Sequence, residues 1–170
     1  MRAISPHGDK ASFVCTDVYA MPEQLSGRFD LALITIGVLN WMPDLTRFLC
    51  AVSSLLAPGG RLLIYETHPV LDMFDPHGEE PHRPQYSYFR TDPFITEDEV
   101  VYDGSEAGKA PPSYWHFHTM GDIVTGCVRA GMQIAELTEH PHSNREVDYD
   151  IYVGNAAQLP LCYTLVATKF

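Results

Sequence analysis

The sequence predicts an α/β fold, because one stretch of the chain alternates between buried-strand and amphipathic-helix patterns. Leu31–Ile36 is a nearly continuous apolar run bounded by Asp30 and Gly37, which is typical of a strand buried on both faces of a parallel sheet. A second apolar run, Leu62–Tyr65, predicts another buried strand after the helix. The three elements are expected to form one right-handed strand, helix and strand unit.

The helix of this unit begins at Pro43 and Asp44. Proline suits the first turn of a helix, and an acidic side chain is favourable near its positive N-terminal end. The segment Ala57-Pro58-Gly59-Gly60 is predicted to be a turn that ends the helix, since proline cannot continue it and glycine accepts a positive φ. The apolar residues at helical spacing, which predict the face packed on the sheet, are Leu45, Phe48, Leu49, Val52, Leu55 and Leu56.

Two further strands complete the predicted sheet. They are Met132–His140 and Leu161–Thr168, near the C-terminus. Gly131 and Pro160 flank them as punctuation.

The composition changes after Pro69. From Asp72 to Ser113 the chain carries most of its prolines and many acids, with scattered tyrosines and phenylalanines. Within this region, Tyr86–Phe89 and Glu99–Tyr102 are predicted to pair as a short antiparallel hairpin. We interpret residues 72–113, approximately, as an insertion that is either a lid over a substrate or a solvated loop without a ligand role.

Length and charge narrow the function classes. A chain of 170 residues, 45% of them hydrophobic, suits a single domain with a real core. The formal charge of −11 argues against nucleic acid or an anionic membrane as the main partner. Without a recognisable leader or an apolar run of membrane-spanning length, the protein is predicted to be soluble and cytoplasmic. The widely spaced cysteines are expected to be buried free thiols: Cys15, Cys50, Cys127 and Cys162.

The order of these features resembles the class I S-adenosylmethionine-dependent methyltransferases, in particular the small-molecule group often called methyltransferase type 11 or 12. The segments that carry the resemblance are 13–17, 29–39, the turn 56–62, 115–118, 122–134 and 161–170. The resemblance implies a partial Rossmann-like sheet with a lid-like insertion, and in this sheet Phe13–Asp17 is a strand that precedes the unit. The last strand, Leu161–Thr168, is implied to run antiparallel and to lie between Leu62–Tyr65 and Met132–His140. It also implies S-adenosylmethionine as the cofactor and a small molecule as the methyl acceptor.

The chain departs from this family before Asp17. Family members open with a strand, a glycine-rich turn for the amino-acid end of the cofactor, and a second strand whose acid holds the ribose hydroxyls. None of these precedes Asp17, so residues 1–170 are expected to form one N-terminally incomplete domain that binds cofactor weakly or not at all. Leu31–Ile36 would then be an apolar sheet edge, covered either by a displaced Ala11–Thr16 strand or, as we predict, in a homodimer.

The resemblance also implies a set of cofactor-binding residues. Asp17 is expected near the adenine amino group, and Val18 offers its backbone there. Ile36 and Gly37 are expected to pass the methionine part of the cofactor. The alternatives are a turn or helix-capping role for Asp17 and a simple strand-end turn at Gly37.

The acceptor is expected at the carboxyl ends of the central strands, where open α/β sheets bind ligands. His68 is the predicted general base, because its unperturbed pKa lies near neutrality. The alternative is a structural histidine that caps the turn before Pro69. The predicted substrate-binding residues, whose aromatic members have core packing as the alternative, are Asn40, Trp41, Glu66, Tyr86 and Trp115.

No metal site is predicted. His116 and His118 fall on one side of an extended segment and would suit a two-ligand metal arm, but no third ligand follows at helical or hairpin spacing. The main hypothesis is therefore a methyltransferase of small molecules, whose activity in this short chain is open. The rival hypothesis is a non-catalytic interaction or scaffold protein that retains a remnant methyltransferase fold, and a metal-dependent hydrolase is the weakest of the three.

Overall fold

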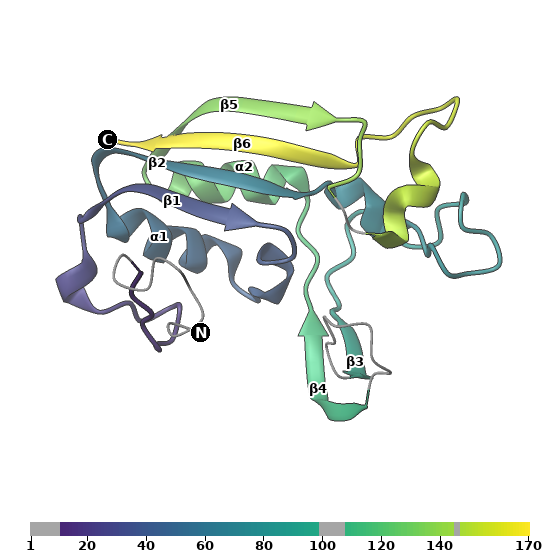
Figure 1. The fold of residues 1–170 in the computed structure, drawn as a ribbon, viewed down its shortest axis with the longest axis horizontal. Coiled ribbons are helices and arrows are strands. Elements are labelled where there is room, and N and C mark those ends of the chain that lie inside the picture. Colours follow the sequence, from purple (N-terminus) through teal and green to yellow (C-terminus); the bar gives the residue numbers. More distant parts are fainter. Residues whose placement is uncertain (1–10, 99–107, 145–146) are drawn as a thin grey trace.

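A four-stranded mixed sheet with two helices on one face forms the body of the protein in the computed structural model, which describes residues 11–98, 108–144 and 147–170 (Figure 1). The two central strands pair antiparallel, as do the last two, and only the first pair is parallel. The last strand of the chain lies between the second and the fifth. The predicted α/β fold with an inserted antiparallel last strand is therefore confirmed. In spatial order the strands are β1 (Phe29–Thr35), β2 (Leu56–Thr67), β6 (Cys162–Lys169) and β5 (Met132–His140).

Both α-helices, α1 (Leu45–Leu55) and α2 (Met120–Arg129), lie on the lower side of the sheet in Figure 1. As predicted, Asp44 caps α1, and its carboxylate accepts a hydrogen bond of 2.9 Å from the backbone N–H of Arg47. Thr119 opens α2 with a capping box, in which its hydroxyl accepts from the N–H of Asp122 and the Asp122 carboxylate accepts from the N–H of Thr119. Each helix thus begins where a side chain satisfies backbone donors that have no partner within the helix.

The core lies between the sheet and the two helices. Four of the predicted apolar residues of α1, Leu45, Phe48, Leu49 and Val52, are buried, whereas Leu55 is only partly buried. The helices approach closely at Gly126, where an added Cβ would stand 2.7 Å from a methyl carbon of Leu49. The sheet contributes the residues Ile34, Leu56, Leu62, Ile64, Met132, Tyr163, Leu165 and Ala167 to this core.

The prediction of a turn at residues 57–60 is wrong, because these residues form part of a strand. These residues belong to the first part of β2, which starts directly after α1. Phe29 pairs with Leu56 and Leu31 with Arg61, so the extra residues form an irregularity in the ladder, as in a β-bulge. Gly59 has a φ of +79°, and a Cβ on Gly60 would stand 2.9 Å from the carbonyl oxygen of Phe29. The glycines therefore permit a bulge, not a separate turn.

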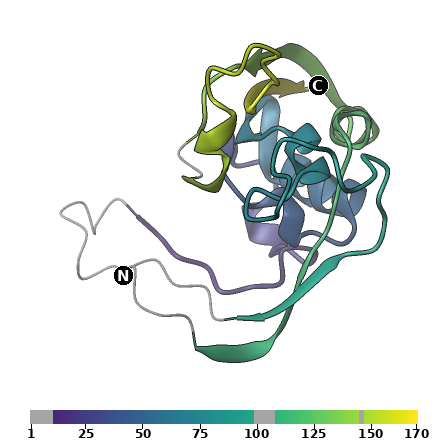
Figure 2. The ribbon, with the colours of Figure 1, turned by 90° about the vertical axis from the view of Figure 1, so that its right-hand side faces the viewer.

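Two strands of the insertion, β3 (Phe94–Asp98) and β4 (Lys109–Trp115), pair antiparallel and project away from the main sheet (Figures 1 and 2). The predicted hairpin is wrong for Tyr86–Phe89, which is not a strand, and its expected partner Glu99–Tyr102 lies outside the described residues. The N–H groups of Gln85 and Tyr86 instead donate to the carbonyl oxygen of Met73. That segment is therefore held to the stretch that follows β2 and not to a strand.

The predicted strand at Phe13–Asp17 is not formed. Its apolar residues Phe13 and Val14 are 64% and 54% exposed, and the carboxylate of Asp17 accepts a hydrogen bond from the N–H of Tyr19 in a local turn. A strand needs a partner, and β1 pairs with no described segment other than β2. The displaced-strand alternative is therefore wrong for the part of the chain that the structure describes.

In the described part of the chain, short 3₁₀ helices connect these elements: η3 (Glu23–Leu25), η4 (Leu39–Trp41), η5 (Pro69–Met73) and η6 (Val147–Tyr152). Two of them, η4 and η5, lie in the segments that follow β1 and β2. All four cysteines are free; Cys127 and Cys162 are buried as predicted, but Cys15 and Cys50 are exposed, the latter on the outer face of α1. None of the helices within the described ranges has the length and apolar character that a membrane span requires.

The exposed edge of β1 leads to a prediction about assembly. Leu31 and Leu33 are 56% and 59% exposed, and they alternate along β1 with Ala32 and Ile34, which pack in the core. We expect a homodimer that pairs through this edge, since native proteins rarely leave apolar edge strands open. Leu33→Lys should weaken dimerisation by about tenfold or more, as measured by sedimentation. Val128→Lys, a change at an exposed apolar residue of α2, is the control, and a wild-type monomer at all concentrations would contradict the prediction.

Candidate functional site

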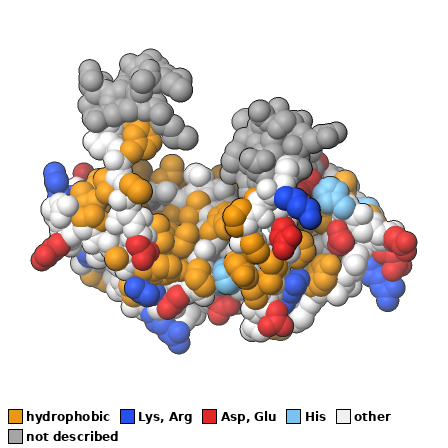
Figure 3. All heavy atoms as spheres, turned by 90° about the horizontal axis from the view of Figure 1, so that it is seen from below, with side chains coloured by type: hydrophobic (Ala, Val, Ile, Leu, Met, Phe, Trp, Pro, Cys, Tyr) orange, Lys and Arg blue, Asp and Glu red, His pale blue; other side chains and the backbone are white. Residues whose placement is uncertain are grey.

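A cavity of about 720 Å³ lies at the carboxyl ends of β1 and β2, and residues of the insertion close it from the other side. Its volume falls within the range of about 300–1,000 Å³ that is usual for small-molecule sites. Figure 3 shows apolar side chains gathered across the middle of the face from which the insertion projects. The wall from the sheet includes residues 36–41, Glu66, Thr67 and Tyr163, and the wall from the insertion includes Asp72, Tyr86, Arg90, Phe94, Trp115 and Phe117.

The carboxylate of Glu66 holds the sheet side of this cavity together. It accepts hydrogen bonds from the backbone N–H groups of Gly37, Val38 and Leu39, at 2.6, 2.8 and 3.3 Å. Glu66 is 3% exposed, and this burial raises its pKa, although the backbone donors oppose the rise. Gly37 can offer its N–H because it adopts a φ of +83°, a conformation that glycine tolerates. The end of β2 is thus tied to the loop that follows β1.

The loop after β1 is in turn tied to the segment that follows β4. The N–H of His116 donates to the carbonyl oxygen of Asn40 at 2.7 Å, and the side-chain amide of Asn40 donates to the carbonyl oxygen of His116 at 2.9 Å. The rings of Trp41 and Trp115 meet edge to face with centroids 5.7 Å apart. These contacts place both tryptophans of the chain in the cavity wall.

Asp72, a residue that the sequence analysis did not select, lies in the cavity on η5. Burial raises the pKa of its carboxyl group to about 7, against the opposing effects of a hydrogen bond from Trp115 and the nearby charge of Arg90; the Glu66 carboxylate adds to the rise. A carboxyl group that titrates near neutrality inside a cavity is a candidate proton acceptor. The signal in the sequence was weak, because Asp72 stands at the start of a segment that reads as a loop.

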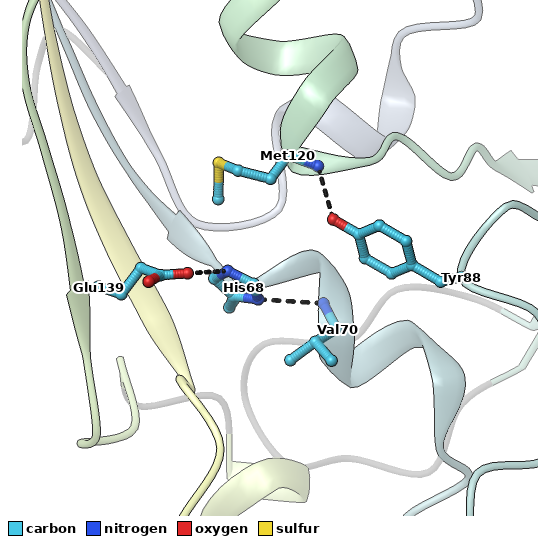
Figure 4. A network of polar contacts seen from close by, with 5 residues as sticks. All are labelled: His68, Val70, Tyr88, Met120 and Glu139. Carbon is cyan, nitrogen blue, oxygen red and sulfur yellow. Dashed lines mark hydrogen bonds and ion pairs between the residues drawn. The ribbon is translucent and has the colours of Figure 1, made fainter.

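Arg90 and Tyr88 order the wall that the insertion provides. The guanidinium of Arg90 lies over the rings of Phe117 and Tyr86, at 4.5 and 5.1 Å from their centroids. The hydroxyl of Tyr88 accepts a hydrogen bond of 2.8 Å from the N–H of Met120 at the start of α2 (Figure 4). The insertion therefore packs against the body of the protein at several points.

His68 is placed differently from the prediction. It does not line the cavity; its Nδ1 accepts a hydrogen bond from the N–H of Val70, so its Nε2–H donates to Glu139 at 2.8 Å (Figure 4). Burial lowers the pKa of the ring. Both nitrogens are occupied by protein groups, and the geometry favours the alternative role of a structural histidine that caps η5. Asp72 replaces His68 as the candidate proton acceptor.

The other predicted residues divide into two groups. Asn40, Trp41, Glu66, Tyr86 and Trp115, which were expected to bind the acceptor, all line the cavity. Of the residues expected to bind the cofactor, Ile36 and Gly37 line it and Asp17 and Val18 do not. The carboxylate of Asp17 is engaged by its own turn, and Val18 packs against the core.

Tyr163 adds an unusual feature to the cavity wall. Its side chain is fully buried, and its hydroxyl has no hydrogen-bond partner among the described residues. Burial, with the nearby carboxylate of Glu66, raises its pKa well above the usual value, so the hydroxyl stays protonated. A buried hydroxyl without a partner is costly, whereas a ligand in the cavity could satisfy it.

The residues considered for a metal arm have other contacts. The backbone N–H of His116 donates to Asn40, and the ring Nε2 of His118 lies 2.8 Å from the carbonyl oxygen of Met42. Within the described part of the chain, no three His, Cys, Asp or Glu side chains are grouped so that they could hold a metal ion.

Comparisons with known proteins agree on one fold. A family model described as a methyltransferase domain matches residues 2–64, and the comparison with curated proteins finds no match. Among solved structures, the chain is similar to a candidate S-adenosylmethionine-dependent methyltransferase from Listeria monocytogenes, with 16% identity and a TM-score of 0.63. It is also similar to an S-adenosylmethionine-dependent methyltransferase from Mesorhizobium loti, with 20% identity and a TM-score of 0.61. The chain is similar as well to the CcbJ methyltransferase from Streptomyces caelestis, with 11% identity and a TM-score of 0.59.

The comparisons show which fold the chain has. In the same order, the three similarities cover 91%, 91% and 99% of this chain and 67%, 67% and 72% of the solved structures. This chain therefore spans about two thirds of the length of those structures. The chain has the fold of the class I S-adenosylmethionine-dependent methyltransferases, and the family match supports the same class. The predicted resemblance is therefore confirmed, and S-adenosylmethionine is the cofactor that the class implies.

The raised pKa of Asp72 leads to a prediction about stability. Its carboxyl pKa is about 7 in the folded chain against 3.8 for an ordinary aspartate. The folded state therefore binds the proton more tightly, and the stability that this carboxyl contributes is present below about pH 4 and lost as the pH rises through about 7. Asp72→Asn should thus be more stable than the wild type at about pH 8, by an amount on the order of 2 kcal/mol, and should lose this advantage near pH 4.

Urea unfolding at several pH values measures this difference. Asp92→Asn is the control, because Asp92 belongs to the same insertion but does not line the cavity. An equal free energy of unfolding for Asp72→Asn and the wild type from pH 4 to 8 would show that the carboxyl group is not desolvated.

Proposed function

We propose that this chain provides the acceptor side of an S-adenosylmethionine-dependent methyltransferase that acts on a small molecule. The observation that carries the proposal is the cavity at the carboxyl ends of β1 and β2, the place where open α/β sheets bind ligands. Its wall contains Ile36 and Gly37, which the methyltransferase resemblance relates to the cofactor. Beside them are the residues predicted for the acceptor.

Size and charge support a small-molecule acceptor. A cavity of about 720 Å³ accommodates a molecule of drug-like size and not a folded nucleic acid. The formal charge of −11 opposes binding to phosphate backbones and anionic membranes. We also propose that the protein works in the cytoplasm, as a homodimer that pairs through the edge of β1.

Methyl transfer depends mainly on the alignment of the methyl donor with the acceptor atom. S-adenosylmethionine, when bound, supplies the methyl group to an acceptor atom in line with the breaking bond. Holding two reactants in line can lower a barrier by about 7–11 kcal/mol, and a general base contributes about 10²- to 10⁴-fold more. In this chain Trp41 and Trp115 would orient the acceptor, and Asp72 would take its proton. His68 would position Asp72 by capping the helix on which Asp72 lies.

The described residues fit only part of the cofactor. Ile36 and Gly37 offer a close backbone wall for its methionine end. The carboxylate of Asp17 is used within its own turn, and no glycine-rich turn between a strand and a helix occurs in the described ranges. The usual anchors for the ribose and the amino-acid end are thus missing from the described part, and we propose weak cofactor binding by this chain.

One observation favours the rival function. The apolar edge at Leu31 and Leu33 would also suit a non-catalytic interaction protein that pairs with another chain. Such a protein would retain the sheet but need not bind S-adenosylmethionine at all. The two functions therefore differ in one measurable property, which is cofactor binding.

Calorimetric titration with S-adenosylmethionine separates them. We expect saturable binding with a Kd between about 10 μM and 1 mM. Gly37→Ala should weaken it, since alanine at a φ of +83° displaces the loop beside the cofactor. Gly131→Ala is the matched control, because Gly131 has a similar φ of +76° and lies after α2.

Each other result has a clear meaning. Micromolar or tighter binding would show that other residues rebuild the missing anchors. Equal binding by Gly37→Ala, Gly131→Ala and the wild type would remove the loop from the cofactor site. No heat of binding at millimolar concentration would contradict the methyltransferase proposal and favour the interaction protein.

A further inference from the structure

The cavity is acidic as well as aromatic. Its wall holds four carboxylates, from Glu66, Asp72, Asp75 and Asp148, and one guanidinium, from Arg90. His118 also lines it, and burial lowers the pKa of that ring, so it adds no positive charge at neutral pH. The electrostatic potential inside therefore favours a ligand that carries a positive charge.

The four carboxylates are not equally available to a ligand. Glu66 uses both oxygens for the backbone N–H groups of the loop after β1. Asp148 pairs with the ring of His77 at 3.3 Å, and Asp75 accepts from the N–H of His77 at 3.0 Å. Asp72 receives a side-chain hydrogen bond from Trp115 and lies near the charge of Arg90. Asp72 and Asp75 therefore both keep capacity to accept from a ligand, and Asp72 is the one that lies beside Trp115 in the aromatic part of the wall.

A second observation points to a ligand independently of the acids. The hydroxyl of Tyr163 is fully buried and has no partner among the described residues, although Tyr163 lines the same cavity. Tyr163 pairs across the sheet with Glu66, so its side chain lies on the same face. The hydroxyl is sealed from the cavity as it stands, so it can accept a hydrogen bond from an N–H group of a ligand, or donate one to it, once the ligand displaces the side chains that cover it.

Aromatic rings form the rest of the wall. Trp41 and Trp115 meet edge to face. The guanidinium of Arg90 lies over the rings of both Tyr86 and Phe117. Faces of such rings bind flat apolar groups and attract cations. A ligand with an aromatic body and a basic nitrogen would therefore satisfy the rings, the carboxylate and the hydroxyl together.

We propose that the methyl acceptor is an aryl-substituted primary or secondary amine, which Asp72 binds as its ammonium ion and then deprotonates for attack. This inference rests on the proposed methyltransferase function and names the substrate class of the same site. Arg90 and Glu66 are the charged groups that act on Asp72, and Asp75, Asp148 and His118 also line the cavity.

The transfer balances with these groups. The ammonium ion gives one proton to the carboxylate of Asp72, which leaves a neutral amine with a lone pair and a neutral carboxylic acid. The nitrogen lone pair forms the new N–C bond while the C–S bond of the sulfonium donor breaks and leaves its electron pair on sulfur. The product is an N-methylammonium ion with a neutral thioether, and Asp72 returns its proton to water when the product leaves.

The chain provides its own reporter for the test. Both of its tryptophans line the cavity, so intrinsic fluorescence follows binding there without a label. We would titrate the protein with phenethylamine, 2-phenylethanol and 3-phenylpropionate, which share an aromatic ring and differ in charge. At about pH 8 we expect phenethylamine to bind about tenfold tighter than the alcohol and tighter still than the anion.

Variants assign the effect to residues. Asp72→Asn should lower the affinity for phenethylamine by about tenfold at pH 8 and leave that for phenylethanol within about twofold. Tyr163→Phe should weaken phenethylamine binding while the free energy of unfolding stays equal or rises, because a buried hydroxyl without a partner is removed. Asp92→Asn, outside the cavity, should change neither affinity.

The pH dependence adds an independent readout. Phenethylamine binding to the wild type should strengthen as the pH rises from about 6 to 8, while Asp72 ionises and the amine stays protonated. In Asp72→Asn this rise should be absent. Equal binding of the three probes, or tightest binding of the anion, would overturn the amine proposal, as would an unchanged pH profile in Asp72→Asn.

The test also keeps this inference apart from the proposed function. Methyl transfer from S-adenosylmethionine to phenethylamine is measured separately by mass spectrometry. Saturable cofactor binding together with a preference for the anion would contradict the proposal that the acceptor is an amine. It would still agree with the proposed methyltransferase function. Charge-selective amine binding with no cofactor binding would instead contradict the methyltransferase function, and with it the acceptor role of the amine.

Discussion

The buried carboxylate of Glu66 is the interaction on which the rest of the site depends. A carboxylate removed from water is costly unless donors surround it, and here three consecutive backbone N–H groups, from Gly37 to Leu39, provide them. The same contact satisfies N–H groups at the start of η4, which have no partner within so short a helix. One side chain at the end of β2 thereby sets the position of the loop after β1. Asn40 and Trp41 lie in the continuation of that loop. They contact His116 and Trp115 and so hold the end of β4 and the segment after it.

The insertion completes a site that the sheet alone leaves open. It brings Asp72, Arg90 and Trp115 over the carboxyl ends of the strands, so that polar and aromatic groups converge on one volume. A desolvated carboxyl group in that place is unfavourable for stability at neutral pH, and such local cost is common where a group serves a ligand. The unpartnered hydroxyl of Tyr163 is a second cost of the same kind. Both costs fall in the cavity, which is the physical basis for placing the chemistry there.

Much of the fold could be predicted because its signals are local. The apolar runs of β1, β2 and β6 and the helical spacing of α1 are set by burial on the sheet, and the acceptor residues follow from the ends of those strands. The strand predicted at Phe13–Asp17 failed because pairing is not local and β1 offers it no contact. His68 has the expected chemistry, but its neighbours Val70 and Glu139 occupy both nitrogens. Asp72 was missed because its burial in the cavity comes from tertiary packing and not from a local sequence pattern.

Amide hydrogen exchange at Gly37, Val38 and Leu39 tests this account most directly. With Glu66 in place, all three N–H groups should exchange slowly, although they lie in a loop and not in a strand ladder. Glu66→Gln should speed their exchange by about tenfold or more, while the amides of β6 keep the protection that they have in the wild type. The matched variant Glu136→Gln, which changes an exposed carboxylate of β5, should leave the loop protected. Fast exchange of the three amides in the wild type, or no change in Glu66→Gln, would contradict the central role given to this carboxylate.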